Sequence, residues 1–209
     1  MARKTKEEAE KTYHALLSAA AEMFTSLGVE ACTLNAIAEK AGVTRGAFYW
    51  HFKNKEDILK GLWLTYTKPA LTENREKILT APSEDKLKTL YQCLIDILHR
   101  IEKDTELGQV FSIILGNSEL TIRNPDVKAF FDEERSMFRE TIEHAFEAER
   151  NIGNLPENTN IHISATGLVC LVSGMVSEFF TGFEDVSLTK HGQIYLDTYF
   201  KGLGLKIPT

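Results

Sequence analysis

The sequence predicts an all-α protein of about nine helices, and three observations support this fold class. Apolar residues recur with helical spacing in almost every segment of the 209-residue chain. Glycine, proline and asparagine fall where these apolar stripes stop, as they do at the ends of helices. No segment alternates apolar and polar residues in the manner of a half-buried strand.

The first two predicted helices both end at glycines. The first helix carries one apolar stripe, made of Leu16, Leu17, Ala20, Phe24 and Leu27. Gly28 follows this stripe as a natural stop. Thr33 offers an N-cap for a second, short helix over residues 34–41, and Gly42 ends it where the turn needs a left-handed backbone.

The next two helices have caps that can be read from the sequence. Thr44 can cap a third helix, and Asn54 with Asp57 three residues later has the form of a capping box for a fourth. Pro69 is expected to kink or end that fourth helix near Lys68. The rest of the chain is expected to form helices over 83–101, through 111–115, from 124 to about 150, over 161–180 and over 187–202, with a loop at 151–160.

Charge is distributed unevenly along the chain, whose net charge is −6. Residues 1–60 hold nine Lys and Arg against eight Asp and Glu, whereas residues 61–209 hold fifteen against twenty-two. The N-terminal part is therefore slightly basic and the remainder clearly acidic, which suggests two functions. The basic residues that gather near the N-terminus and the third helix are Arg3, Lys4, Lys6, Arg45, Lys53 and Lys55.

Several classes of protein are disfavoured by the sequence. The longest uninterrupted apolar runs are shorter than the ~20 residues of a membrane span, and the N-terminus lacks the apolar stretch of a secretory signal. The three cysteines are far apart and lack metal-ligand spacing, which indicates thiols in a reducing compartment. No nucleotide-binding, nucleophile or metal motif is present. We therefore expect a cytoplasmic protein that is not an enzyme and has no cofactor or metal.

The segment TRGAFYWHF, residues 44–52, contains four aromatic residues within five positions. On a helix, Phe48 and Phe52 share one side and are predicted to enter the core. Tyr49, Trp50 and His51 are left outside or at the rim. Exposed aromatic surface of this extent usually marks a binding site, although Trp50 could also pack and His51 could be a core or metal-binding histidine.

Two short helices joined by a tight turn at residues 42–44 form a helix-turn-helix signature, which predicts DNA binding. Arg45 can read guanine O6 and N7 in the major groove, while Gly46 allows close approach to the backbone. Trp50 could contact a thymine methyl group. The expected phosphate contacts are Thr33, Thr44, Tyr49, His51 and Lys55. The arm formed by Arg3, Lys4 and Lys6 is either a further DNA anchor or a solvated tail.

Residues 33–59, TLNAIAEKAGVTRGAFYWHFKNKEDIL, resemble the DNA-binding signature of the TetR family of bacterial regulators. The segments MARKTKEEA and VTRGAFYWHFKNKEDI are similar to its AcrR-like efflux-pump repressors. The resemblance implies a helix-turn-helix DNA-binding head, assigned to residues 1–53, and a helical ligand-binding and dimerisation body over residues 54–209. It also implies a homodimer formed through the last two helices.

The residues of the ligand pocket are assigned with this resemblance in view. The candidates are Trp63, Tyr66, Phe111, Ile114, Phe138 and Met175, each of which could instead be plain core. Their aromatic and Met content suits an apolar or planar drug-like effector. Glu178 could recognise a cation but is also explained as a rim carboxylate. The helix over 161–180 is apolar on nearly every side, so it must be buried on every side, in part by a partner subunit.

The function expected from these features is a dimeric repressor that binds a pseudo-palindromic operator and is released by a small hydrophobic or drug-like effector. Its third helices would enter successive major grooves, roughly one turn of ~10 bp or a multiple apart. An efflux pump or a related operon is the expected target. The alternatives are a TetR-type regulator of another pathway, possibly an activator, and a small-molecule carrier without DNA binding.

Overall fold

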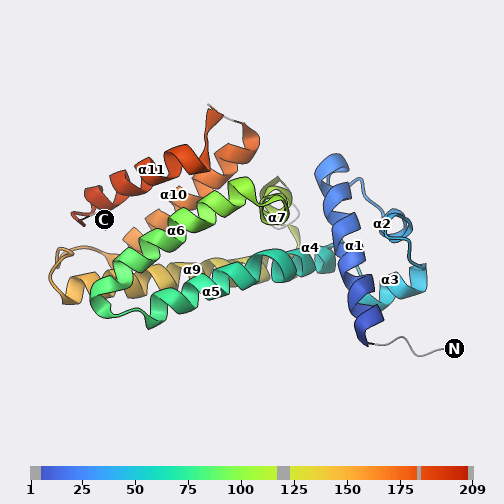
Figure 1. The fold of residues 1–209 in the computed structure, drawn as a ribbon, viewed down its shortest axis with the longest axis horizontal. Coiled ribbons are helices and arrows are strands. Elements are labelled where there is room, and N and C mark those ends of the chain that lie inside the picture. The colour runs from blue at the N-terminus through green and yellow to red at the C-terminus, as the bar shows by residue number, and fades with distance from the viewer. Residues whose placement is uncertain (1–5, 117–122, 183–184, 207–209) are drawn as a thin grey trace. The chain divides into compact units, whose positions relative to one another are not determined.

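The computed structural model describes residues 6–116, 123–182 and 185–206, and within these ranges it is helical with no strand. Figure 1 shows the helices in chain order. If α4, the π-turn and α5 are counted as one helix, the described residues form nine, as the sequence predicted. The bounds are α1 Lys6–Leu27, α2 Leu34–Lys40, α3 Arg45–His51, α4 Lys55–Leu62, a π-turn Trp63–Thr67, α5 Lys68–Thr80, α6 Lys86–Lys103, α7 Thr105–Gly116, α9 Pro125–Asn151, α10 Ile161–Thr181 and α11 Leu188–Gly202.

The chain divides into two compact units. The first unit consists of residues 1–67 and 109–128, and the second of residues 68–108 and 129–209. The boundary expected between residues 53 and 54 falls inside the first unit, because α4 packs against α1. Packing therefore groups α4 with the helix-turn-helix. The functional division into head and body stays a prediction.

The core of the first unit comes from the apolar stripes of α1 to α4. Leu16, Leu17 and Phe24 of α1 are buried, as are Ile37 of α2 and Phe48 of α3. Burial of such side chains contributes about 1.5–3 kcal/mol each. The amide of Gln109, in α7, donates a hydrogen bond of 3.1 Å to the Thr25 hydroxyl of α1.

The turns of the first unit form as the sequence predicted. Gly28 and Gly42 both have positive φ, +80° and +68°, which a residue with a side chain rarely adopts. The N–H of Asp57 donates to Asn54 Oδ1 at 2.8 Å. The Asp57 carboxylate accepts in return from the N–H of Lys53 at 3.0 Å, one residue earlier than in a standard capping box.

Pro69 does not end the helix near Lys68. The backbone changes from α to π geometry over Trp63–Thr67 and returns to α geometry at Lys68, so the helical segment continues to Thr80. Proline lacks the N–H that would bond to the carbonyl of Thr65, and its ring would clash there. A wider π turn just before the proline accommodates this loss.

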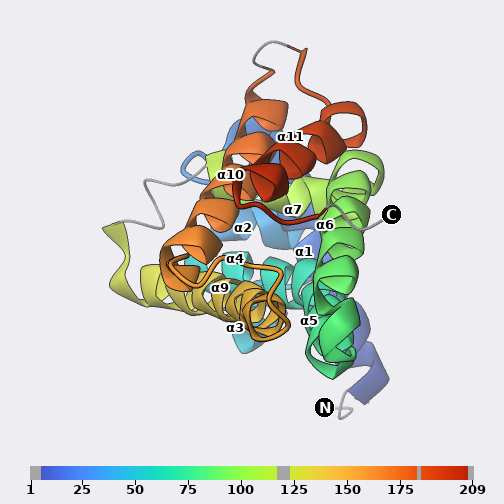
Figure 2. The same cartoon turned by 90° about the vertical axis from the view of Figure 1, so that its left-hand side faces the viewer.

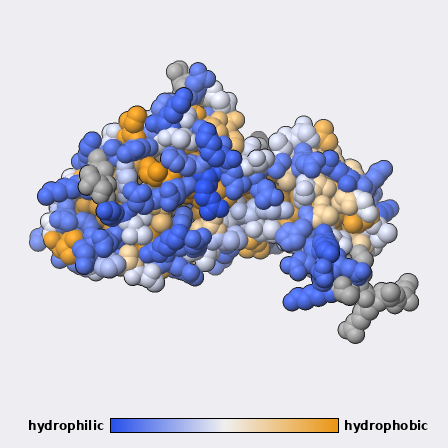
Figure 3. Space-filling model, viewed as in Figure 1, coloured by the Kyte–Doolittle hydropathy of each residue, from blue (hydrophilic) through white to orange (hydrophobic). Residues whose placement is uncertain are grey.

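The second unit is built around α6 and α11, which pack against each other, with α5 on α6 and α10 on α11. In Figures 1 and 2, α10 and α11 lie side by side. The core residues of the second unit include Leu90, Leu94, Leu98, Ile142, Phe146, Leu168, Leu196 and Phe200. The Tyr91 hydroxyl of α6 donates to the Asp197 carboxylate of α11 at 2.6 Å. Figure 3 shows that mostly hydrophilic residues cover the face toward the viewer.

Glu102, near the end of α6, fixes the start of α11. Its Oε2 accepts hydrogen bonds from the N–H of Thr189 at 2.7 Å and from the Ser187 hydroxyl at 3.1 Å. Burial raises the pKa of the Glu102 carboxyl, but the hydrogen bonds from Thr189 and Ser187 outweigh it and lower the pKa to about 2. The charged form of Glu102 is therefore the one that stabilises this junction.

We expect Glu102→Gln to lower the free energy of unfolding by about 1–2 kcal/mol at pH 7, because a charge-assisted pair of hydrogen bonds becomes a neutral one. The folded pKa of about 2 lies below the unfolded value of about 4.3, so this contribution is present above pH ~4.3 and is lost as the pH falls toward 2. Urea unfolding of both proteins between pH 7 and pH 2.5 measures it. A difference that is as large at pH 2.5 as at pH 7 would contradict the role of the charge.

Helix α10 corrects one argument from the sequence. Judged by uninterrupted apolar runs, the chain has nothing of membrane-spanning length. Taken as a helix over Ile161–Thr181, α10 is by length and composition apolar enough to cross a membrane, and only 28% of an 18-residue apolar stretch within it is buried inside the protein. Glycine and serine residues interrupt its apolar runs without making the helix polar. Much of the apolar surface of α10 is therefore not covered within a single chain.

Candidate nucleic-acid interface

The outward face of α3 is polar and aromatic, as predicted. Arg45 and Gly46 are exposed, Tyr49 is 49% exposed and Trp50 is 73% exposed. Phe48, on the opposite side of the same helix, is only 1% exposed. Helical periodicity thus divides the aromatic residues into one that packs and two that face solvent. Adjacent exposed aromatic residues on one helix form the kind of surface that often marks a binding site.

Two exposed threonine hydroxyls cap the N-termini of α2 and α3. Thr33 accepts a hydrogen bond from the N–H of Ala36, and Thr44 accepts one from the N–H of Ala47, both at 3.2 Å. A threonine that caps a helix uses an oxygen lone pair, so the hydroxyl hydrogen is left to donate. Each exposed cap can therefore also donate a hydrogen bond to a phosphate oxygen.

His51 is the last residue of α3 and is half-buried. Its ring meets the Trp50 ring edge-on, with centroids 4.6 Å apart, and lies 5.8 Å from the ring of Tyr13 on α1. Both of these contacts hold the imidazole at the border between the core and the outward face. An imidazole at such a border can present a nitrogen to phosphate while its other side stays packed.

Lys55, the first residue of α4, has a role that the sequence argument did not foresee. Its ammonium donates to the carbonyls of Val29 at 2.8 Å and of Glu30 at 3.0 Å, in the α1–α2 turn. An ammonium has three donors, so one remains for a phosphate. Lys55 therefore fastens α4 to this turn, whatever it contributes to DNA binding. Of the predicted N-terminal arm, Arg3 and Lys4 lie outside the described residues.

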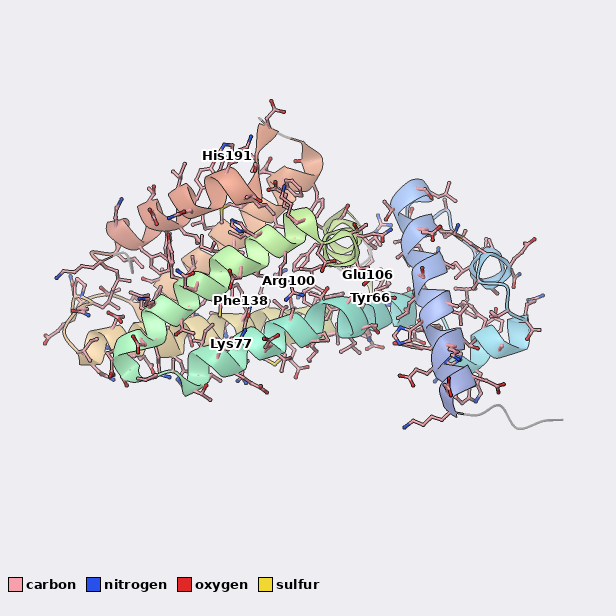
Figure 4. The ribbon with its side chains drawn as sticks, viewed as in Figure 1. Tyr66, Lys77, Arg100, Glu106, Phe138 and His191 are labelled. Carbon is pink, nitrogen blue, oxygen red and sulfur yellow. The ribbon has the colours of Figure 1, made fainter. Side chains whose placement is uncertain are left out.

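The predicted ligand-pocket residues are distributed over both units. In the first unit, the buried Trp63 ring packs edge-on against Phe111, with centroids 5.5 Å apart, while Tyr66 and Ile114 are half-buried. The second unit holds the other two predicted residues. Phe138, which is labelled in Figure 4, is half-buried on α9, and Met175 is buried on α10. Among these residues, Trp63 and Phe111 are in direct ring contact.

A separate open groove of about 470 Å³ lies in the second unit, between the end of α5 and the start of α6. Lys77, Lys88, Asp85 and Asp96 give it a mixed charge. None of the predicted ligand-binding residues lines it. A charged, open groove lacks the apolar enclosure that drug-like molecules need.

Comparison with known proteins assigns the family. Residues 16–62 match the bacterial regulatory proteins of the tetR family. The probable acrEF/envCD operon repressor of Escherichia coli (strain K12) is 30% identical over 204 residues, which cover 96% of this chain and 90% of that protein. The chain belongs to the TetR family.

Further similarities confirm the AcrR-like subgroup within the TetR family. The transcriptional regulator AcrR of Shigella flexneri is 28% identical over 200 residues, covering 94% of this chain and 91% of that protein. The solved SmeT–triclosan complex superimposes with a TM-score of 0.83 at 25% identity, covering 94% of this chain and 95% of that one. SmeT is described as the repressor of the Stenotrophomonas maltophilia multidrug efflux pump SmeDEF.

The TetR-family match covers α2, α3 and α4, together with the part of α1 from residue 16. It therefore spans the helix-turn-helix and the exposed side chains of α3, and the chain is a transcriptional regulator with an N-terminal helix-turn-helix. Sequence reasoning missed two residues that pack behind this face, Tyr13 and Gly61. Their partners lie in other helices, so no local pattern could have indicated them.

Proposed function

We propose that this TetR-family protein is a cytoplasmic, ligand-responsive repressor that binds a pseudo-palindromic operator as a dimer and controls an efflux pump or a related operon. The observation that carries the proposal is the outward face of α3, where Arg45, Tyr49 and Trp50 are exposed and the helix begins at the exposed Thr44 cap. A carrier without DNA binding would leave that exposed face without a use. An enzyme would require a catalytic set, and the sequence offers none.

The DNA contacts divide by chemistry. Arg45 is the candidate for base recognition, since a guanidinium matches guanine O6 and N7 bidentately. Trp50 can contact a thymine methyl group, and Gly46 leaves room for the sugar–phosphate backbone. The remaining side chains fit phosphate, which positions the protein without reading sequence; these are Thr33, Thr44, Tyr49, His51 and Lys55.

The homodimer is proposed to form through α10 and α11. Ile163 of α10 is 64% exposed, and Ile194 and Tyr195 of α11 are 60% and 41% exposed. Cys170, Ser173 and Gly174 are also exposed on α10. Apolar side chains on two adjacent helices favour burial by a second copy, and small residues allow helices to approach closely.

The effector is proposed to be small and hydrophobic or drug-like. Support comes from the aromatic character of Trp63, Tyr66 and Phe111 in the first unit and Phe138 in the second, and from the solved triclosan complex of the related SmeT. A ligand that binds the DNA-incompetent state more tightly would release the operator. If it weakens DNA binding ~100-fold, the coupling free energy is about 2.7 kcal/mol.

The test of DNA binding is a gel shift with duplexes that tile the chain's own upstream region and the promoter of the adjacent operon. We expect one site-preferring complex whose affinity falls steeply with salt, because phosphate contacts release counterions. Competition with unrelated duplex DNA of equal length provides the control. Equal retention of every fragment, or of none, would refute the proposed function.

We expect triclosan, used as the probe, to lower the affinity of the protein for its retained duplex. Fluorescence anisotropy with a labelled duplex, titrated at fixed protein concentration, measures this release. A polar molecule of similar size, such as glucose, serves as the control. Release by triclosan alone supports an apolar effector site, whereas no effect of triclosan combined with release by glucose would contradict it.

A further inference from the structure

Behind the outward face of α3, rings from two helices meet. Tyr13 of α1 stacks on Phe52, the residue that ends α3, with centroids 5.1 Å apart and planes inclined by 24°. The Tyr13 ring also lies 5.8 Å from that of His51, inclined by 53°. His51 is thus in contact with one ring of α1 and with the exposed indole of Trp50. Offset and tilted pairs at these separations attract each other.

Gly61 brings α4 against the same rings. A Cβ atom placed at Gly61 would lie 3.0 Å from the Tyr13 hydroxyl oxygen and 3.1 Å from Cε1 of Phe52. Both separations are tighter than ordinary contact between carbon and its neighbours. The absence of a side chain at Gly61 therefore lets the α4 backbone support Tyr13 and Phe52 from behind. Helices α1 and α4 therefore both pack against the end of α3.

This packing sets the position of His51 before DNA arrives. Tyr13 is half-buried and Phe52 is 3% exposed, so both rings belong to a packed layer. A side chain already fixed in its bound orientation loses less freedom on binding than one that turns freely. The benefit appears in DNA affinity although Tyr13 itself lies behind the outward face.

We propose that Tyr13 is a positioning residue for DNA binding, which holds the imidazole of His51 toward the phosphate backbone. The proposal rests on the proposed function, because it requires that His51 contact DNA. The aromatic ring of Tyr13 supplies the effect, through its stacking on Phe52 and its contact with His51. The hydroxyl group is not required.

The experiment compares Tyr13→Leu, Tyr13→Phe, His51→Ala and the double variant Tyr13→Leu/His51→Ala in the full chain. Affinity is measured by anisotropy on the duplex that the natural protein retains in the gel shift. We expect Tyr13→Leu to weaken binding roughly three- to tenfold, the usual effect of freeing one interfacial side chain. Tyr13→Phe, which keeps the ring, should bind with the affinity of the natural protein. In the Tyr13→Leu background, His51→Ala should add less than about a twofold loss.

Two outcomes would overturn the proposal. If the losses from Tyr13→Leu and His51→Ala multiply in the double variant, the two side chains act independently. If Tyr13→Phe loses as much as Tyr13→Leu, the hydroxyl group and not the ring is responsible.

Met23→Ala, a change at a half-buried position of the same helix, controls for general loosening of α1. It should lower the melting temperature without the loss of affinity, and an equal loss of affinity would refute the positioning role. If the natural protein retains no duplex, the proposed function itself is refuted. That result is distinguishable from the outcomes above, which all require that the natural protein bind DNA.

Discussion

Phe48→Ala should lower the free energy of unfolding of the first unit by about 3–5 kcal/mol, the usual cost of removing a large aromatic side chain from a core. Phe48 is 1% exposed and lies edge-on to Tyr49, tilted against Phe52. The cavity would lie directly beneath α3, which has only seven residues and is held by tertiary packing rather than by its own helical stability. Operator binding should fail together with the fold.

Trp50→Ala is the matched control, two residues away on the same helix. Trp50 is 73% exposed, so its removal should change the free energy of unfolding by less than about 0.5 kcal/mol. DNA affinity should nevertheless fall if the indole contacts a base or the backbone. The two variants thus distinguish Phe48, which stabilises the fold, from Trp50, which is exposed for binding.

Tryptophan fluorescence measures the free energy of unfolding of the first unit in both variants. The chain has two tryptophans, Trp50 and Trp63, and both belong to the first unit. A urea titration followed by fluorescence therefore reports on the unfolding of that unit, with Trp63 as the remaining probe in the Trp50→Ala protein. Equal destabilisation by the two changes would contradict the assignment of their roles.

The local features of the head could be predicted from the sequence because their causes are local. Thr33 and Thr44 cap helices through N–H groups three residues ahead, and Gly42 takes the left-handed φ that a tight turn requires. Helical periodicity likewise separated buried Phe48 from exposed Tyr49 and Trp50. For the caps and the turn the partner lies within one turn of helix, and for the aromatic residues the helical spacing alone decides which side of α3 each occupies.

The contacts between helices could not be predicted in this way. Lys55 donates to carbonyls 25 and 26 residues earlier, and Tyr13 of α1 stacks on Phe52 at the end of α3. Periodicity says that a face is buried but not which helix covers it. The π-turn before Pro69 is a further case, because a proline predicts a disturbed hydrogen-bond ladder but not how the backbone absorbs it.

Arg45→Ala should weaken operator binding by about 1–3 kcal/mol and relax base preference at one position of each half-site. Arg45 is the first residue of α3 and is exposed. A cation at the N-terminus of a helix is opposed by the helix dipole, which costs a few tenths of a kcal/mol or more. Arginine is thus unfavourable for the stability of α3 at this position, and a role toward an external partner accounts for it.

The expected signature is therefore a loss of operator affinity without a loss of stability. Arg45→Ala should leave the free energy of unfolding unchanged or raise it slightly, while affinity for the operator falls. Arg45→Lys keeps the charge but loses the bidentate geometry, so it should retain non-specific binding and lose base preference. Anisotropy on duplexes with each base pair of a half-site replaced in turn measures the preference. A uniform loss on every duplex would make Arg45 a phosphate contact, because phosphates carry no sequence information and only contacts to base edges can be lost at one position alone.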